Sequence, residues 1–226
     1  MSPPRRIWVT RTEPQAEATA ARLRRMGLDP VVAPVLEARP IAGAAIDLAG
    51  VDAIAFTSGH GVSAFAALSD RRDLPAFAVG QTTAALARAA GFASVTASSG
   101  GATGLAKAIG AASPKPRLVL NPTAAEPAAD LAAILAGLEI GARIVAVYET
   151  SAAGPDAAPA DIDAILIHSA KAARLVAGLI APAEAARIAV FAISGAAAAP
   201  LSALPFARIA AAPFPDEASL LDLLQG

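Results

Sequence analysis

Two short stretches decide the fold of this chain: Ala53-Ile54-Ala55-Phe56-Thr57-Ser58 and Ala164-Ile165-Leu166-Ile167-His168-Ser169. Each is an apolar run that ends in a polar turn, and helical composition follows in residues 62–68 and 172–180. Such a run is typical of a strand buried on both faces, and the helix after it indicates the βα unit of a parallel sheet. Because residues 76–86 and 189–198 also resemble each other, the sequence predicts two similar α/β halves.

The same alternation of strand and helix continues on both sides of these stretches. Strands are predicted at residues 7–10, 31–33, 53–57, 76–79, 94–96, 118–120, 143–147, 164–167, 188–193 and 207–210. Helices are predicted at residues 14–26, 62–68, 82–90, 103–109, 128–138, 172–180 and 217–224. The central segment then has five strands and the C-terminal segment three, so the two strands before residue 34 complete the second set.

The predicted fold class is therefore α/β, with two similar domains that each contain a five-stranded parallel sheet. The first domain is discontinuous and consists of residues 1–34 plus 151–226. The second domain, residues 40–146, is inserted into the first, and residues 34–40 and 146–151 are the connectors between them.

Composition excludes several classes of function. Lys+Arg 18 against Asp+Glu 19 gives a net charge of -1, which lacks the basic footprint of a nucleic-acid-binding protein. With Cys 0 and His 2, neither a disulfide framework nor a transition-metal site is expected. Prolines interrupt the longest uncharged stretch, residues 188–207, and no signal peptide is recognised, so we expect a cytoplasmic protein without a membrane span.

The candidate binding residues lie where the predicted strands end. In open α/β sheets, ligands bind beyond the carboxyl ends of the strands, where helix N-termini present free backbone N–H groups. Hydroxyls and glycines at these ends either cap helices or bind a polyanion, and their repetition in both halves favours the polyanion. The candidates are Thr10, Arg11, Thr57, Ser58, Gly80, Thr82, Thr83, His168, Ser169, Lys171 and Ser194, and residues 121–123 form a further predicted turn.

Two kinds of side chain have alternative interpretations. Tyr148, the only tyrosine, lies where the second domain returns the chain to the first. Its ring either anchors this connector or presents its phenol to an interdomain cleft. His60 and His168 follow strands, where each either donates to a ligand or fills a turn. No P-loop, α/β-hydrolase elbow or complete dinucleotide-binding motif occurs, and no carboxylate has an evident catalytic setting.

Several of these segments resemble the uroporphyrinogen-III synthase family, and their order and spacing cover nearly the whole chain. The matching segments are Thr10-Arg11, residues 27–34, Phe56-Thr57-Ser58 with Gly61-Val62, Val79-Gly80 with Thr83-Ala84, Ala90-Gly91-Phe92, Val147-Tyr148-Glu149-Thr150 and His168-Ser169. One segment departs from the family. Where the family often has a hydroxyl within the C-terminal helix, residues 194–198 of this chain contain only that of Ser194.

The resemblance implies two flavodoxin-like domains joined by a two-stranded connector. It also implies that the substrate hydroxymethylbilane binds between them without cofactor or metal and leaves as uroporphyrinogen III. By this resemblance, water would be lost to give an azafulvene, ring D would attack through its substituted carbon, and a spiro intermediate would reclose with ring D inverted. We expect a monomer.

The resemblance also suggests roles for individual residues. Tyr148 would assist departure of the hydroxyl as a hydrogen-bond donor, and Arg11 would pair with a carboxylate. Thr83, Ser58 and Ser169 would hold carboxylates or pyrrole edges. The alternative is a non-catalytic two-domain protein that binds a tetrapyrrole or a small anion.

Overall fold

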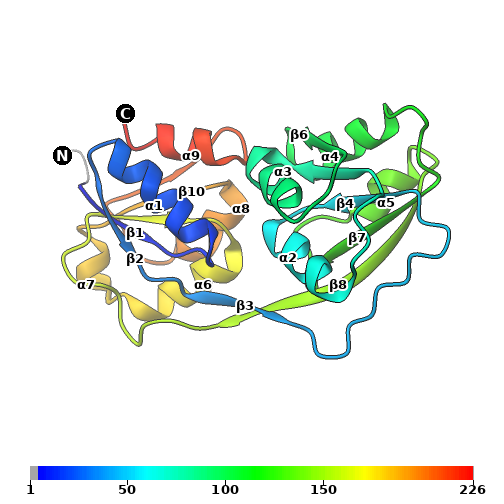
Figure 1. Ribbon diagram of the computed structural model, residues 1–226. Helices are drawn as coiled ribbons and strands as arrows, with labels where there is room; N and C mark the ends of the chain where they lie inside the picture. Colours follow the sequence, from blue (N-terminus) through cyan, green and yellow to red (C-terminus); the bar gives the residue numbers. More distant parts are fainter. Residues whose placement is uncertain (1–4, 226) are drawn as a thin grey trace. The chain divides into compact units, whose positions relative to one another are not determined.

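The computed structural model describes residues 5–225, which divide into two compact units (Figure 1). One unit contains the described residues up to Glu37 together with those from Ser151 onward, and the other is Ala38–Thr150. We call them unit 1 and unit 2. Residues 1–4 and 226 of the predicted first domain lie outside the described residues.

Unit 1 is built on a five-stranded sheet with the order β11-β10-β9-β1-β2. Its strands are β1 (Arg6–Val9), β2 (Asp29–Val32), β9 (Ala164–Ile167), β10 (Ala189–Ala192) and β11 (Arg208–Ala211). Every neighbouring pair is parallel. The strands β1, β9 and β10 are almost entirely buried, which explains their unbroken apolar sequences.

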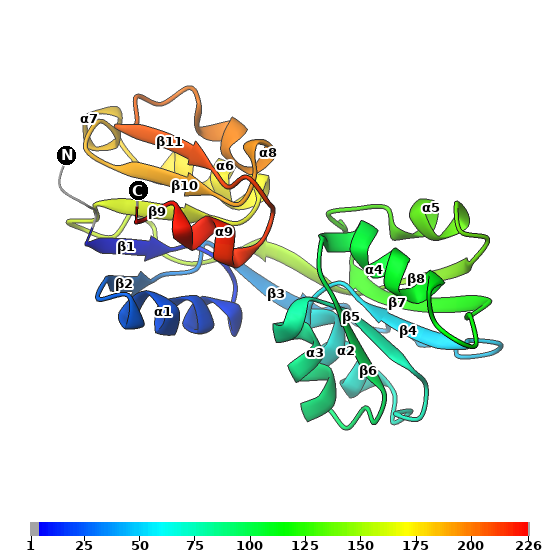
Figure 2. The ribbon, with the colours of Figure 1, turned by 90° about the horizontal axis from the view of Figure 1, so that it is seen from above.

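Helices cover both faces of this sheet (Figure 2). They are α1 (Gln15–Arg25), α6 (Ala170–Leu179), α7 (Pro182–Ala185), α8 (Gly195–Ala198), the 3-10 helix η1 (Ala199–Leu201) and α9 (Glu217–Asp222). Leu23 of α1 and Leu220 of α9 pack on one face with Ile7 and Val9. Helices α6, α7 and α8 pack on the other face around Trp8 and Ile165.

Unit 2 contains a sheet of six strands rather than the predicted five, in the order β3-β8-β7-β4-β5-β6. The strands are β3 (Leu36–Pro40), β4 (Ala53–Phe56), β5 (Ala76–Val79), β6 (Val95–Ser98), β7 (Leu118–Ala124) and β8 (Gly141–Ala152). The extra strand is β3, which the sequence placed in a connector. Residues 35 and 41 are hydrogen-bonded to residues 153 and 147, so β3 runs antiparallel to β8.

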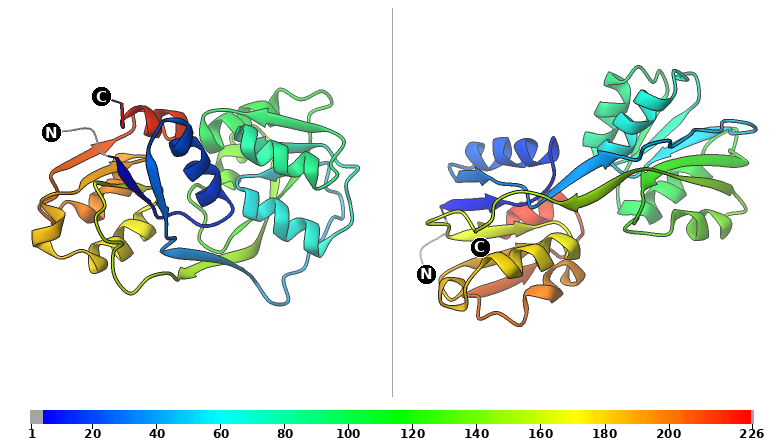
Figure 3. Two further views of the ribbon diagram at one scale, coloured as in Figure 1. Left: turned by 60° about the vertical axis from the view of Figure 1, so that its left-hand side comes forward. Right: turned by 90° about the horizontal axis from the view of Figure 1, so that it is seen from below.

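The helices of unit 2 also form two layers, which the right-hand view of Figure 3 shows on opposite sides of the sheet. They are α2 (Gly59–Leu68), α3 (Gly80–Ala89), α4 (Gly101–Gly110) and α5 (Leu131–Ala136). Phe65 of α2 and Ala87 of α3 pack around Phe56. Leu105 of α4 and Leu135 of α5 pack on the opposite face.

The strand orders show where the chain order of the strands reverses within each sheet. Numbered in chain order within each unit, the parallel strands follow 2-1-3-4-5 in unit 1 and 3-2-1-4-5 in unit 2. The switch point of unit 1 therefore lies between β1 and β9, and that of unit 2 between β4 and β7. Ligands of open α/β sheets bind beyond the carboxyl ends of the strands at such switch points.

Strand β7 and helix α7 also differ from the sequence prediction. Strand β7 continues to Ala124, so residues 121–123 belong to the strand and not to a turn. Asn121 keeps the strand in register because its side-chain amide donates to the backbone oxygen of Ala55 at 2.7 Å. Helix α7 was not predicted, because four residues are too short to show a helical period.

Candidate functional site

Several of the predicted site residues lie at the switch point of each sheet. In unit 2, Thr57 and Ser58 directly follow β4. The hydroxyl of Thr57 lies 3.5 Å from that of Thr123, near the end of the neighbouring strand β7. In unit 1, Arg11 follows β1, and His168 follows β9, the next strand in the sheet.

The tyrosine of unit 2 is held against the beginning of α2. The Tyr148 hydroxyl lies 2.9 Å from Ser58 Oγ. Ser58 is also the N-cap of α2, and its Oγ accepts the backbone N–H of Gly61 at 3.1 Å. A Cβ on Gly61 would lie 2.5 Å from the backbone oxygen of Pro122, so glycine is what lets α2 begin this close to β7.

A β-bulge directs Tyr148 inward. In the β7–β8 pair, Thr123 pairs with Ala146 but Ala124 pairs with Tyr148, so Val147 is the extra residue. Successive side chains of a regular strand point to opposite faces, yet Val147 and Tyr148 are both buried in one cluster with Ala64 of α2. Bulges commonly redirect a side chain beside a site, and this one places the phenol at α2.

A small pocket in unit 2 includes this tyrosine. Its volume is about 210 Å³, and Tyr148 and His60 line it with Arg39, Ser63 and apolar side chains. The rings of His60 and Tyr148 have centroids 5.3 Å apart. Burial raises the pKa of Tyr148, and the hydrogen bond with Ser58 lowers it only in part. The phenol therefore keeps its proton at neutral pH and can donate it in a hydrogen bond.

The turn at α3 holds three further candidates, which lie apart from the contacts of Tyr148. Gly80 begins the helix at a φ of 74°, where glycine is favoured, and no side chain caps it. Thr83 is buried on the inner side of this helix, whereas Thr82 is exposed.

The cluster of unit 1 is built on an ion pair that the sequence analysis missed. Glu217, the first residue of α9, accepts from Arg11 Nη1 at 2.5 Å and from the hydroxyl of Thr19. His168 Nε2 lies 3.2 Å from the same carboxylate, and His168 Nδ1 is buried without a hydrogen-bond partner among the described residues. The positive charge of Arg11 is therefore already neutralised inside the unit.

The surroundings shift the pKa of each ionisable group in this cluster. Burial alone would raise the pKa of Glu217, but the His168 hydrogen bond and the charge of Arg11 outweigh it and lower the pKa to about 2. Burial lowers the pKa of His168, although Glu217 opposes this, so the imidazole is neutral at pH 7. Burial also lowers the pKa of Arg11, which remains charged because an arginine starts above 12.

The other candidates of unit 1 have mainly structural contacts. Thr10 is 0% exposed, and its hydroxyl donates to the backbone oxygen of Leu166 at 2.7 Å, which ties β1 to β9. Ser169 and Ser194 are the N-caps of α6 and α8, as the capping interpretation expects. Lys171 is half-buried in the first turn of α6.

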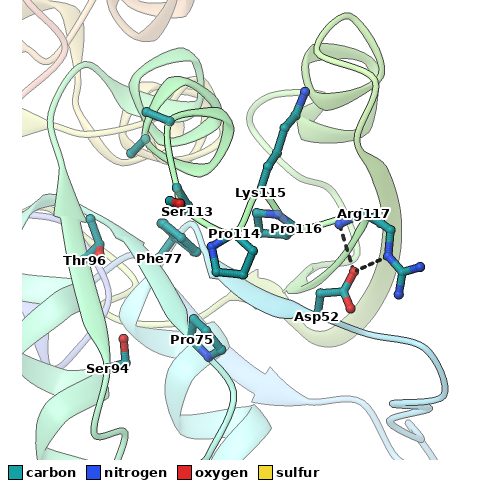
Figure 4. A pocket seen from close by; sticks show the side chains of 13 residues that line it. Asp52, Pro75, Phe77, Ser94, Thr96, Ser113, Pro114, Lys115, Pro116 and Arg117 are labelled. Carbon is teal, nitrogen blue, oxygen red and sulfur yellow. Dashed lines mark hydrogen bonds and ion pairs between the residues drawn. The ribbon is translucent and has the colours of Figure 1, made fainter.

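A larger pocket in unit 2 contains none of the predicted site residues (Figure 4). Its volume is about 830 Å³, and it is lined by residues that directly precede strands, such as Asp52, Pro75 and Arg117. It therefore lies at the amino ends of the strands, opposite the edge where such sheets bind ligands. Backbone N–H groups of Arg117 and Leu118 lower the pKa of Asp52, so this carboxylate secures the start of β7.

Two further classes of site were searched for among residues 5–225. No group of three or more metal-ligating side chains comes together within this range. No helix in the same range is both long and apolar enough to cross a bilayer.

Sequence reasoning missed Glu217 and the ring contact of His60. Glu217 begins a predicted helix after the last strand, and helix starts after parallel strands gather at one edge of a sheet. That placement could have put Glu217 near Arg11. No sequence signal could have paired the ring of His60 with Tyr148, because the bulge in β8 decides this contact.

Comparisons with known proteins concern the family and the fold. The curated proteins contain no significant match to the chain. Two solved structures resemble it at 17% identity. Uroporphyrinogen-III synthetase from Helicobacter pylori has a TM-score of 0.62, with 98% of each chain covered. A mutant uroporphyrinogen III synthase from Thermus thermophilus has a TM-score of 0.51, with 98% of this chain and 96% of that chain covered.

The similarity to these structures shows a shared fold. A family model described as uroporphyrinogen-III synthase HemD matches residues 17–222, which include Tyr148, Ser58 and Glu217. This chain therefore belongs to the uroporphyrinogen-III synthase family.

Proposed function

We propose that this protein is a uroporphyrinogen-III synthase, a lyase that dehydrates and cyclises hydroxymethylbilane with inversion of ring D. The observation that carries the proposal is the family match over residues 17–222, together with a protonated phenol at the switch point of unit 2. The reaction needs a linear tetrapyrrole to be folded so that one ring closure is selected, which is mainly a task of positioning.

Tyr148 is the proposed catalytic residue. The substrate loses its hydroxyl and, overall, the proton of the same ring's pyrrole N–H, which together give water and an azafulvene. Negative charge develops on the departing oxygen, and a hydrogen-bond donor stabilises that charge. A phenol whose pKa is raised by burial supplies the donor without being ionised itself. Ring D then attacks the azafulvene, and the spiro intermediate reopens and recloses to uroporphyrinogen III.

Some of the remaining candidates are proposed to bind the substrate's carboxylates and pyrrole edges. The pocket at Tyr148, about 210 Å³, is smaller than pockets that enclose a whole drug-sized ligand, so it accommodates only part of the bilane. The hydroxyl turns at Thr57, Thr83, Ser169 and Ser194 supply neutral donors for the rest. Neutral donors bind carboxylates without burying excess positive charge.

We further infer that units 1 and 2 are the two predicted domains and that β3 and β8 form the two-stranded connector. The strand order 2-1-3-4-5 supports a flavodoxin-like topology for unit 1, whereas the order 3-2-1-4-5 of unit 2 departs from it. The cytoplasmic location and the monomeric state stay predictions.

The proposed activity is tested by supplying hydroxymethylbilane and separating the uroporphyrinogen isomers. We expect isomer III with the protein and isomer I without it, because the bilane closes without inversion when unaided. Accumulation of isomer I alone would contradict the synthase activity. It would favour the alternative, a non-catalytic tetrapyrrole-binding protein, if uroporphyrinogen III still bound.

The role of Tyr148 is tested by Tyr148→Phe. This change keeps the ring against His60 and removes only the phenolic hydroxyl, so we expect kcat to fall on the order of 10²-fold with product affinity nearly unchanged. Ser202→Ala is the matched control, since it removes one exposed hydroxyl that bonds only to Ala199, and its kcat should equal that of the wild type. An unchanged rate in Tyr148→Phe would remove the phenol from the mechanism.

A further inference from the structure

The hydrogen bond between Ser58 and Tyr148 has a direction that its surroundings decide. A serine hydroxyl has one proton and two lone pairs, and a phenol also has one proton to donate. Ser58 Oγ uses a lone pair for the backbone N–H of Gly61 at 3.1 Å. Among the described residues, the Tyr148 oxygen at 2.9 Å is the only hydrogen-bonded atom that can accept the Ser58 proton.

The phenol proton of Tyr148 has a further possible acceptor. Tyr148 lines the pocket of about 210 Å³, so a ligand bound there is a candidate acceptor for the phenol proton. If Tyr148 donated to Ser58, the serine proton would be left without an acceptor in a half-buried position, which costs free energy. If Ser58 donates, its proton is accepted by Tyr148, and the phenol proton remains available to a ligand in the pocket.

We propose that Ser58 is a positioning residue that donates its hydroxyl proton to Tyr148 and thereby directs the phenol proton toward the ligand in the pocket. This deepens the proposed function, on which its catalytic consequence rests. It assigns Ser58 a role through Tyr148 in place of a direct contact with a substrate carboxylate. The effect of Ser58 on the phenol can be measured without any substrate.

The chain contains a matched control for the capping role of Ser58. Ser169 caps α6 in unit 1 with nearly the same backbone angles, φ -159° and ψ 154° against φ -156° and ψ 158°. Its Oγ accepts the N–H of Ala172 at 3.1 Å, the same distance as in α2, but it makes no bond to a tyrosine. Ser169→Ala therefore removes a cap alone, whereas Ser58→Ala removes a cap and the contact with Tyr148.

The experiment is an alkaline titration of tyrosinate absorbance, which reports Tyr148 alone because it is the only tyrosine in the chain. A donor to the phenol oxygen stabilises the ionised form, so its removal raises the pKa. We expect Ser58→Ala to raise the pKa of Tyr148 by about 0.5–1 unit, Ser58→Thr to restore it, and Ser169→Ala to leave it unchanged. An unchanged or lower pKa in Ser58→Ala would overturn the proposal.

The other polar groups near Tyr148 do not alter this comparison. His60, whose ring faces the phenol, and Arg39 and Ser63, which line the same pocket, are present in every variant. Because the same groups surround Tyr148 in wild type and variant, their effects on its pKa cancel in the comparison. Far-UV circular dichroism at each pH confirms that the folded state is being titrated.

Steady-state kinetics provide the second measurement. If Ser58 acts through Tyr148, Ser58→Ala lowers kcat about 10-fold with KM within twofold, and it has no further effect in the Tyr148→Phe background. A raised KM with kcat unchanged would instead mark Ser58 as a substrate ligand and overturn the proposal. If the wild type forms only isomer I, the proposed function fails, yet the titration still tests whether Ser58 donates to the oxygen of the ionised phenol.

Discussion

Glu217 is the side chain whose setting in unit 1 departs furthest from that of an ordinary surface carboxylate. It is 16% exposed and faces Arg11, Thr19 and His168 at the switch point. The Arg11–Glu217 pair lowers the local charge to zero, so a substrate carboxylate there would compete with a carboxylate of the protein. Neutral donors nearby are consequently better suited to bind it than Arg11 is.

This setting predicts how stability depends on pH. Glu217 titrates near pH 2 when folded and near 4.5 when unfolded, so its contribution, on the order of 2–3 kcal/mol, is complete above pH 4.5 and is lost toward pH 2. His168, whose pKa is lowered from 6.5, begins the same loss below pH 6.5. Urea denaturation of Glu217→Gln should show lower stability at pH 7 and a flatter dependence between pH 4.5 and 2.

The control is Glu17→Gln, which removes a carboxylate that is paired with Arg24 but is 57% exposed. Exposed pairs contribute ~0–1 kcal/mol, so this variant should unfold nearly as the wild type does at every pH. Equal losses in Glu17→Gln and Glu217→Gln would contradict the proposed importance of the buried cluster.

At the scale of elements, the closeness of α2 to β7 and the bulge of β8 together place the phenol. Gly61 allows the first turn of α2 to lie against Pro122, and the extra residue Val147 turns Tyr148 toward that turn. Neither feature alone would bring the Tyr148 hydroxyl to Ser58. The site therefore depends on the packing of three elements, and a small shift of α2 should affect it.

Gly61→Ala tests this dependence. Its Cβ would overlap a backbone oxygen at 2.5 Å, so α2 must move, and we expect the free energy of unfolding to fall by ~1–3 kcal/mol and kcat to fall with it. Gly178→Ala in α6 is the control, because a Cβ there meets nothing within 4 Å, and its helix should gain up to ~1 kcal/mol. Thermal unfolding and kcat of both variants provide the comparison. If Gly61→Ala were as stable as the wild type, α2 could move away from β7 without cost, which would contradict the prediction.

At the scale of the whole molecule, each hydrophobic cluster draws its described residues from a single unit. The two units thus have separate cores, and each core is enclosed by its own helices. Separate cores permit separate unfolding transitions, in which case a single free energy of unfolding does not describe the protein.

The only tryptophan, Trp8, makes this testable, because its fluorescence reports the core of unit 1. Leu23 and Leu135 are both 0% exposed, in unit 1 and unit 2 respectively, and each change to Ala should cost ~2–5 kcal/mol. In urea, Leu23→Ala should move the fluorescence transition, whereas Leu135→Ala should move the circular dichroism transition and leave fluorescence nearly unchanged. Identical shifts by both probes would mean that the units unfold together.

The sequence by itself determined most of the strands and helices in their order along the chain, and most of the polar turns at strand ends. These follow from local patterns, since a buried parallel strand such as residues 164–167 must be apolar throughout and its turn must be polar. The same local patterns left out β3, whose Leu36–Pro40 segment includes a charged residue at every second position and pairs with a distant strand.

Only the tertiary structure decided which side chains meet. Arg11 and Glu217 are 206 residues apart in the chain and become neighbours because β1 and α9 pack together in unit 1. Tyr148 reaches Ser58 because one extra residue in β8 reverses the side to which the phenol points. Sheet order, register and bulges depend on packing over the whole unit, so no local pattern contains them.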